Sequence, residues 1–165
     1  MSSPVEIVPI SERHIESFHA VLDEVARERR YLAMLEAPSL EDVRSFTKRM
    51  MGAGLPRLVA LVGDQVVGWC DLDVKLRETL KHTAILGMGI ARSYRGRGIG
   101  LRLMEATLQA AKEKGLTRIE LMVRVDNERA KKLYDKVGFV VEGLCRRYML
   151  VDGQYYDGYL MAVLL

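Results

Sequence analysis

The sequence has few cysteines and no long apolar run, which argues against a disulfide-rich protein and a membrane protein. Its two cysteines, Cys70 and Cys145, are too few for a disulfide framework and show no metal-ligand spacing. We therefore expect small buried hydrophobic side chains in a reducing compartment, in preference to a reactive thiol. No apolar run approaches the length of a membrane span, and residues 1–10 lack the basic and apolar regions of a signal peptide. These absences predict a cytoplasmic protein with no membrane partner.

Neither charge nor hydropathy is extreme in this chain of 165 residues. Hydrophobic residues make up 49% and charged residues 28% of it, which predicts a folded chain and argues against disorder. The length suits one domain over residues 1–165. A net charge of +3, with bases and acids interleaved, fits an anionic ligand and gives no reason to expect a nucleic acid partner.

Apolar spacing and turn residues predict a mixed α/β domain, which excludes a helical bundle or a β-sandwich. Strands are expected over residues 5–10, 58–62, 65–74, 83–91, 118–125, 139–151 and 154–164. Helices are expected after the N-cap residues Ser11, Ser39 and Asn127 and over residues 101–114. The pairs Gly63-Asp64 and Asp152-Gly153 predict hairpin turns.

The most informative segment is the run Arg95-Gly96-Arg97-Gly98-Ile99-Gly100, which joins the expected strand 83–91 to the expected helix 101–114. The first N–H groups of a helix have no intrahelical partner, and the helix dipole adds to their partial positive charge. Glycine lets the backbone approach an anion closely. The segment therefore predicts an anion site, with a phosphate group as its natural ligand.

Two common phosphate-binding motifs do not match this segment. A P-loop has lysine and then serine or threonine after its last glycine, whereas Leu101 and Arg102 follow Gly100. A dinucleotide-binding motif needs Gly-x-Gly-x-x-Gly early in a βαβ series, with an acidic residue about 20 positions on. Here the glycine spacing differs, and Glu120 falls within an expected strand. A purely structural turn is the alternative at this stage.

The same segment resembles the acyl-CoA loop of the GNAT superfamily of N-acetyltransferases, whose pattern is Gln or Arg, two residues, Gly, one residue, and Gly or Ala. Further on, the run NERAKKLYDKVGF from Asn127 to Phe139 resembles the second motif of the family: Asn, two residues, Ala, three residues, Tyr, then Gly-Phe. The order of elements matches too. The resemblance covers almost the whole chain and implies a single domain with a central mixed, mostly antiparallel sheet flanked by helices.

The resemblance also implies an acetyl-CoA site and no metal. The backbone N–H groups of residues 95–100 are expected to hold the CoA pyrophosphate, which a helix start can do without particular side chains. Arg95 and Arg97 are expected to pair with phosphates or, alternatively, to be solvated loop charges. The implied acetyl-CoA contacts are Met88, Gly89, Ile90, Arg95, Gly96, Arg97, Gly98, Ile99, Gly100, Asn127, Ala130 and Tyr134.

The implied reaction is direct attack of a primary amine on the thioester through a tetrahedral intermediate. A main-chain N–H near Gly89 would stabilise the oxyanion, and Tyr134 would protonate the departing thiolate as general acid. The general base is left open, because no acidic residue lies between Thr83 and Ala91. Its candidates are Glu36, Asp71, Asp73, His82 and Glu120, and histidine is the residue type that titrates nearest neutrality.

The acceptor site is expected to include Tyr31 and Glu36, where a carboxylate would pair with an ammonium group unless it is simply solvated. The run 148–161 is similar to members that act on free amino acids or small amines, which favours a small-molecule acceptor such as an amino acid. A protein N-terminus or lysine is the alternative acceptor, and a non-catalytic CoA-binding regulatory module is the alternative of another class. The C-terminal hairpin, expected over residues 139–164, could pack or exchange across a two-fold axis and so predicts a homodimer. Alternatively, it completes the sheet of its own chain.

Overall fold

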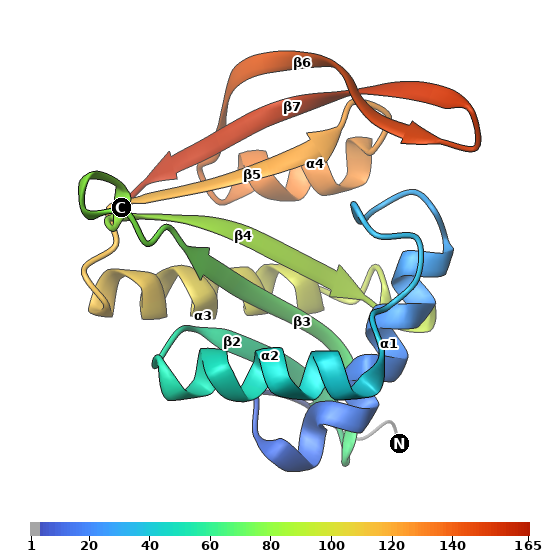
Figure 1. Cartoon of the computed structure of the whole chain (residues 1–165), viewed down its shortest axis with the longest axis vertical. Coiled ribbons are helices and arrows are strands. Elements are labelled where there is room, and N and C mark those ends of the chain that lie inside the picture. Colours follow the sequence, from blue (N-terminus) through green and yellow to red (C-terminus); the bar gives the residue numbers. More distant parts are fainter. Residues whose placement is uncertain (1–3) are drawn as a thin grey trace.

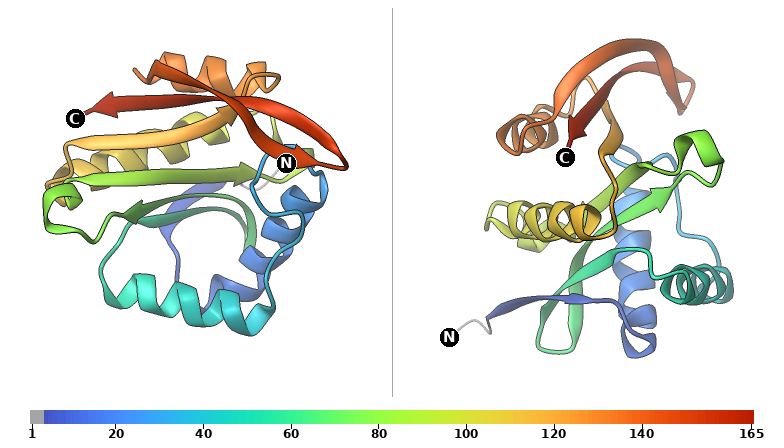
Figure 2. Two further views of the ribbon diagram at one scale, coloured as in Figure 1. Left: turned by 45° about the horizontal axis from the view of Figure 1, so that its top comes forward. Right: turned by 90° about the vertical axis from the view of Figure 1, so that its left-hand side faces the viewer.

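The protein is described by a computed structural model that covers residues 4–165. The first three residues, which begin the segment where no signal peptide is expected, lie outside the described residues. Seven strands form one sheet in the order β1-β2-β3-β4-β5-β7-β6. Helices α1 and α2 lie on one face of the sheet and α3 and α4 on the other (Figures 1 and 2). The expected sheet flanked by helices is confirmed.

The expected helices and strands are present with small shifts at their ends. They are β1 (Val5–Pro9), α1 (Ile15–Arg27), α2 (Leu40–Gly52), β2 (Arg57–Val62), β3 (Gln65–Val74), β4 (Thr83–Ile90), α3 (Ile99–Glu113), β5 (Arg118–Arg124), α4 (Glu128–Lys136), β6 (Val140–Val151) and β7 (Gln154–Leu164). Helix α3 begins before the expected residue 101, because Gly98 takes the N-cap position with a positive φ of 76°. Ser11 begins a 3₁₀ turn, Glu12–His14, that leads directly into α1.

The sheet separates two hydrophobic cores. On one face, the apolar side of α3 is buried against β2 and β3, with Leu103 and Met104 fully enclosed. On the other face, Phe18 of α1 packs edge-on against Trp69 of β3, with ring centroids 5.6 Å apart. Each fully buried side chain of this size stabilises the fold by about 1.5–3 kcal/mol relative to exposure. The two cores together hold β3 and β4 rigidly in the middle of the molecule.

Among the strands of residues 4–165, β4 and β5 form the one parallel pair, and they are hydrogen-bonded neighbours only at their first residues. Thr83–Ile85 pairs with Arg118–Glu120, whereas β3 pairs with β4 from Ala84 to Ile90 and β7 pairs with β5 along its whole length. Beyond Ile85 the two strands diverge, as Figure 1 shows at the right-hand end of β4. The carboxyl-terminal half of β4 therefore presents an edge toward β5 that no strand covers.

The hairpin formed by β6 and β7 completes the sheet of its own chain, which was one of the two expectations for it. Strand β6 is the outer strand beside β7, and several of its apolar side chains, among them Val140 and Leu150, are exposed. Its pairing with β7 shifts register between Cys145 and Met149, a bulge that was not expected from the sequence. Within residues 4–165, no helix is long and apolar enough to span a membrane.

Candidate active site

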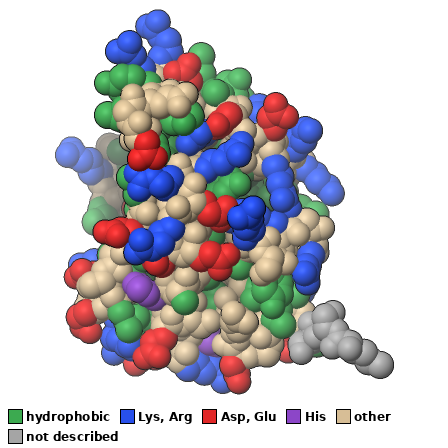
Figure 3. Space-filling model, turned by 90° about the vertical axis from the view of Figure 1, so that its right-hand side faces the viewer, with side chains coloured by type: hydrophobic (Ala, Val, Ile, Leu, Met, Phe, Trp, Pro, Cys, Tyr) green, Lys and Arg blue, Asp and Glu red, His purple; other side chains and the backbone are tan. Residues whose placement is uncertain are grey.

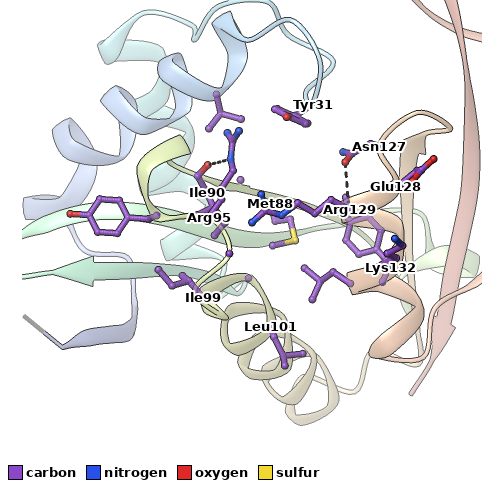
Figure 4. A pocket seen from close by; sticks show the side chains of 18 of the residues that line it. Tyr31, Met88, Ile90, Arg95, Ile99, Leu101, Asn127, Glu128, Arg129 and Lys132 are labelled. Carbon is purple, nitrogen blue, oxygen red and sulfur yellow. Dashed lines mark hydrogen bonds between the residues drawn. The ribbon is translucent and has the colours of Figure 1, made fainter. Parts of the chain in front are cut away.

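A cavity of about 890 Å³ opens where β4 and β5 separate (Figure 4). Its walls come from the end of β4, the glycine-rich loop, the start of α3, and α4 with the turn before it. This volume is in the range of sites for cofactor-sized ligands. The cavity gathers most of the residues singled out from the sequence, namely Tyr31, Met88, Gly89, Ile90, Arg95, Gly96, Gly98, Ile99, Gly100, Asn127, Ala130 and Tyr134.

The free edge of β4 supplies main-chain groups to this cavity. Ala91 donates its N–H to Val67 and Thr83 accepts from Lys75, so the odd-numbered residues of β4 bond to β3. In an antiparallel ladder the residues in between direct their N–H and C=O groups to the opposite side. The N–H of Met88 therefore faces the gap between β4 and β5. An extended ligand can bond to such an edge as an added strand would.

The start of α3 supplies a second set of main-chain donors. Gly96 and Gly98 both have positive φ, 78° and 76°, and no heavy atom lies within 4 Å of where a Cβ of Gly98 would be. The first amide bonded within the helix is that of Arg102, which donates to the Gly98 carbonyl. The preceding amides have no intrahelical acceptor. The loop thus has the shape and the open donors that an oxyanion requires.

The two arginines of the loop are both bonded to groups of the protein itself. Arg95 donates through Nη1 to Glu28 (2.9 Å) and through Nε to the Ile90 carbonyl (2.9 Å), and its guanidinium lies over the Tyr31 ring at 4.8 Å (Figure 4). Arg97 lies outside the cavity lining, because its guanidinium turns back to the Ser93 carbonyl (2.8 Å). Arg95 therefore fixes the loop to α1 and β4, whereas Arg97 is bonded to the loop's own backbone.

Tyr134 presents an uncharged phenol to the cavity. It projects from α4, is only 8% exposed, and packs against Phe139 with ring centroids 5.9 Å apart. Burial, with a smaller contribution from nearby Cys70, raises the pKa of Tyr134 well above its usual range. The hydroxyl therefore keeps its proton at physiological pH and can donate it. Asn127, which caps α4 by accepting the Ala130 N–H at 3.2 Å, holds this helix in place (Figure 4).

Basic side chains that the sequence reasoning missed form part of the cavity wall. Arg129, Lys132 and Lys136 project from α4, and Arg30 projects from the segment after α1. Their spacing of three and four residues on α4 is a signal that was readable from the sequence. Figure 3 shows Lys and Arg side chains interspersed with Asp and Glu on one face of the molecule, and the cavity lining itself includes Asp126 and Glu128. The four basic side chains of the wall favour a ligand that carries negative charge.

The segment after α1 is tied across the molecule by ion pairs that join distant parts of the chain. Arg29 binds Asp152 of the β6–β7 turn with Nη2 to Oδ1 at 2.6 Å, and Arg30 donates to the Asp126 carbonyl at 3.1 Å. Arg124 donates to both carboxylate oxygens of Asp126 and lies over the Tyr156 ring at 3.5 Å. These contacts hold the segment that carries Tyr31 beside the cavity.

Three of the candidate bases, Glu36, His82 and Glu120, lie away from the cavity or are already hydrogen-bonded to basic side chains. Glu36 is exposed and faces Arg27 at 3.4 Å, outside the cavity lining. His82 precedes β4 and is exposed roughly 20 Å along the strand from Met88, at 3.3 Å per residue. Burial raises the pKa of Glu120, but hydrogen bonds from Lys75 and Arg118 outweigh it and leave the pKa lowered. Among the described residues no cluster of three His, Cys, Asp or Glu side chains is placed to hold a metal ion.

Comparison with known proteins agrees with this architecture. The model of the acetyltransferase (GNAT) family matches residues 18–139. An L-amino acid N-acetyltransferase of Escherichia coli, AaaT, is 33% identical over 91% of this chain and 94% of its own. The N-alpha-acetyltransferase RimI of Mycobacterium tuberculosis is 37% identical over 60% of each chain. A phosphinothricin acetyltransferase from Sinorhizobium meliloti, solved in complex with AcCoA, has a TM-score of 0.91, 18% identity, and coverage of 98% of this chain and 88% of its own.

The cavity, its main-chain donors and these matches define an acyl-CoA-dependent transferase. The chain belongs to the GNAT family of acetyltransferases and is an acetyl-CoA-dependent N-acetyltransferase. The unpaired edge of β4, the open amides at the start of α3 and the basic wall fit acetyl-CoA, which combines an extended amide-bearing arm with phosphates.

The role of Arg95 can be separated from that of Arg97 by replacing each with methionine. We expect R95M to weaken acetyl-CoA binding about tenfold, ~1.4 kcal/mol, because the loop loses its bonds to Glu28 and Ile90. We expect R97M to change it less than about twofold, within ~0.4 kcal/mol. Isothermal titration calorimetry measures both. A larger loss in R97M would instead show that its guanidinium pairs with phosphate.

Proposed function

We propose that the main-chain amides at the start of α3 bind the CoA pyrophosphate and that the edge of β4 binds the pantetheine arm. The open space at Gly98 and the unpaired N–H of Met88 support this assignment. The same Met88 N–H is placed to donate to the carbonyl oxygen as negative charge develops there. Asn127, Ala130 and Tyr134 complete the site from the side of α4.

The acceptor that we propose is the amino group of a free amino acid or a similar small amine. The observation that carries this proposal is the similarity to the L-amino acid N-acetyltransferase AaaT, which extends over nearly the full length of both chains. The relative RimI, named as an N-alpha-acetyltransferase, matches over a shorter part of both chains and makes a protein N-terminus the second candidate.

Tyr134 is the proposed general acid for the leaving thiolate. Transfer from a phenol to an ordinary thiolate is uphill in water, because the reference pKa of a phenol is higher. Burial raises the pKa of Tyr134 and also that of the neighbouring Cys70 thiol, so it does not favour the phenol over a thiol as the proton donor. The transfer that we propose therefore depends on a direct hydrogen bond from the Tyr134 hydroxyl to the departing sulfur.

Thiol release from acetyl-CoA, measured with a panel of acceptors, tests the proposed function. The panel contains free L-amino acids, their carboxamides, simple amines and short peptides with a free N-terminus. We expect the highest kcat/KM with a free amino acid. Preference for the peptides would favour the second candidate, whereas binding of acetyl-CoA without turnover on any acceptor would support a non-catalytic CoA-binding module.

Replacement of Tyr134 with phenylalanine tests the general acid. Because the ring and its packing against Phe139 are kept, we expect Y134F to bind acetyl-CoA within about twofold of the wild-type affinity, ~0.4 kcal/mol. Loss of the proton donor lowers kcat by about a hundredfold. Steady-state kinetics with the best acceptor and calorimetric titration of acetyl-CoA measure the two effects. An unchanged kcat would remove Tyr134 from the mechanism.

A further inference from the structure

Two glycines on β4, Gly87 and Gly89, let one side chain of β3 lie directly over each of them on the face of the sheet that carries α1 and α2. A Cβ at Gly89 would lie 2.2 Å from the Trp69 ring, and a Cβ at Gly87 would lie 2.9 Å from Oδ1 of Asp71. The register pairs Trp69 with Gly89 and Asp71 with Gly87. An apolar ring and a carboxylate thus lie directly over the strand on either side of Met88.

The Asp71 carboxylate is held in place through one of its oxygens, and its other oxygen has no hydrogen-bond donor among the described residues. Its Oδ2 accepts from Nη2 of Arg57 at 2.7 Å, while Oδ1 has no hydrogen-bond donor among the residues that the structure describes. Arg57 is itself held between the rings of Phe18 and Phe46, 5.0 Å and 5.1 Å from the two centroids. Its Nη1 donates to Thr47 of α2 at 2.8 Å. Oδ1 therefore remains available above Gly87.

Asp71 is the carboxylate nearest to Met88 among the candidate bases on β3, although it is not one of the residues that line the cavity. The Asp71 side chain is 17% exposed, whereas Glu120 is bonded to two cations. Asp73 is exposed on the same strand, farther from Met88. Burial raises the pKa of Asp71. The positive charge of Arg57 opposes this rise, and the negative charge of Asp73 adds to it. A carboxyl group with a raised pKa is a better proton acceptor.

We propose that Oδ1 of Asp71 binds the acceptor's ammonium group and takes its first proton, an assignment that rests on the proposed amine acetylation. The resulting lone pair forms the C–N bond at the thioester carbon held near the Met88 N–H. The C–S bond breaks, and the sulfur takes the proton of the Tyr134 hydroxyl. The second proton of the amine nitrogen passes through water to Tyr134, and Asp71 releases the first to solvent. One ammonium and one thioester thus give one amide, one thiol and one free proton.

Replacement of Asp71 with asparagine keeps its shape and removes the base. With the best amine of the panel we expect D71N to lose about a hundredfold in kcat/KM. With hydroxylamine, a nucleophile that is uncharged at neutral pH, the loss shrinks to less than about tenfold, because no proton has to be removed before attack. The affinity for acetyl-CoA stays within about twofold. A merely structural ion pair would lower the rates with both nucleophiles equally.

A second variant, with a matched control, tests the space beside Oδ1 without removing either charge of the Arg57–Asp71 pair. In G87A the new methyl group occupies the space beside Oδ1, so we expect the same selective loss with the charged amine. G143A is the matched control, because nothing lies within 4 Å of a Cβ there. If D71N does not fold, G87A decides the question.

Three results would overturn the proposal. They are equal losses with both nucleophiles, wild-type rates in D71N or G87A, and a larger loss in D73N than in D71N. A wild-type protein that acetylates no amine overturns the proposed function together with this inference, whereas an active wild type with an active D71N overturns the role of Asp71 alone.

Discussion

The early end of pairing between β4 and β5 is the constraint on which the rest of the site depends. Main-chain groups that are buried must find partners, so an unpaired strand edge inside a domain is costly unless a ligand or water completes it. Here β3 fixes one side of β4 and β7 fixes one side of β5, and the two strands cannot rejoin without breaking those ladders. The gap is therefore a permanent feature of the fold, ready to accept an extended ligand.

The surrounding elements position the ligand's other parts relative to this edge. The start of α3 directs open amides toward the cavity, and Arg95 locks the preceding loop to Glu28 and to the last carbonyl of β4. Helix α4 places the Tyr134 phenol on the opposite wall. On the far face, Asp71 and Trp69 lie over the two glycines that flank Met88. In the proposed assignment, acetyl-CoA and the amine approach one stretch of backbone from opposite faces of the sheet.

Whether a feature of the fold or the site could be predicted from the sequence depends on how far apart in the sequence the interacting residues lie. Local signals were sufficient for the hairpins at Gly63-Asp64 and Asp152-Gly153 and for the cap at Asn127, because each involves neighbours within a few residues. The bonds of Arg95 to Glu28 and of Arg29 to Asp152 join residues 67 and 123 positions apart, and no local pattern predicts them. The choice of Asp71 likewise needs the β3–β4 register, which places its carboxylate over Gly87.

Hydrogen exchange of the β4 amides, followed by NMR with and without acetyl-CoA, tests the central claim most directly. The Gly87 and Gly89 amides face β3 and serve as internal references, so they are expected to exchange slowly in both states. The Met88 amide faces the gap, and the account predicts fast exchange in the free enzyme and marked slowing once acetyl-CoA is bound. A Met88 amide that is already protected in the free enzyme, or that acetyl-CoA leaves unchanged, would contradict it.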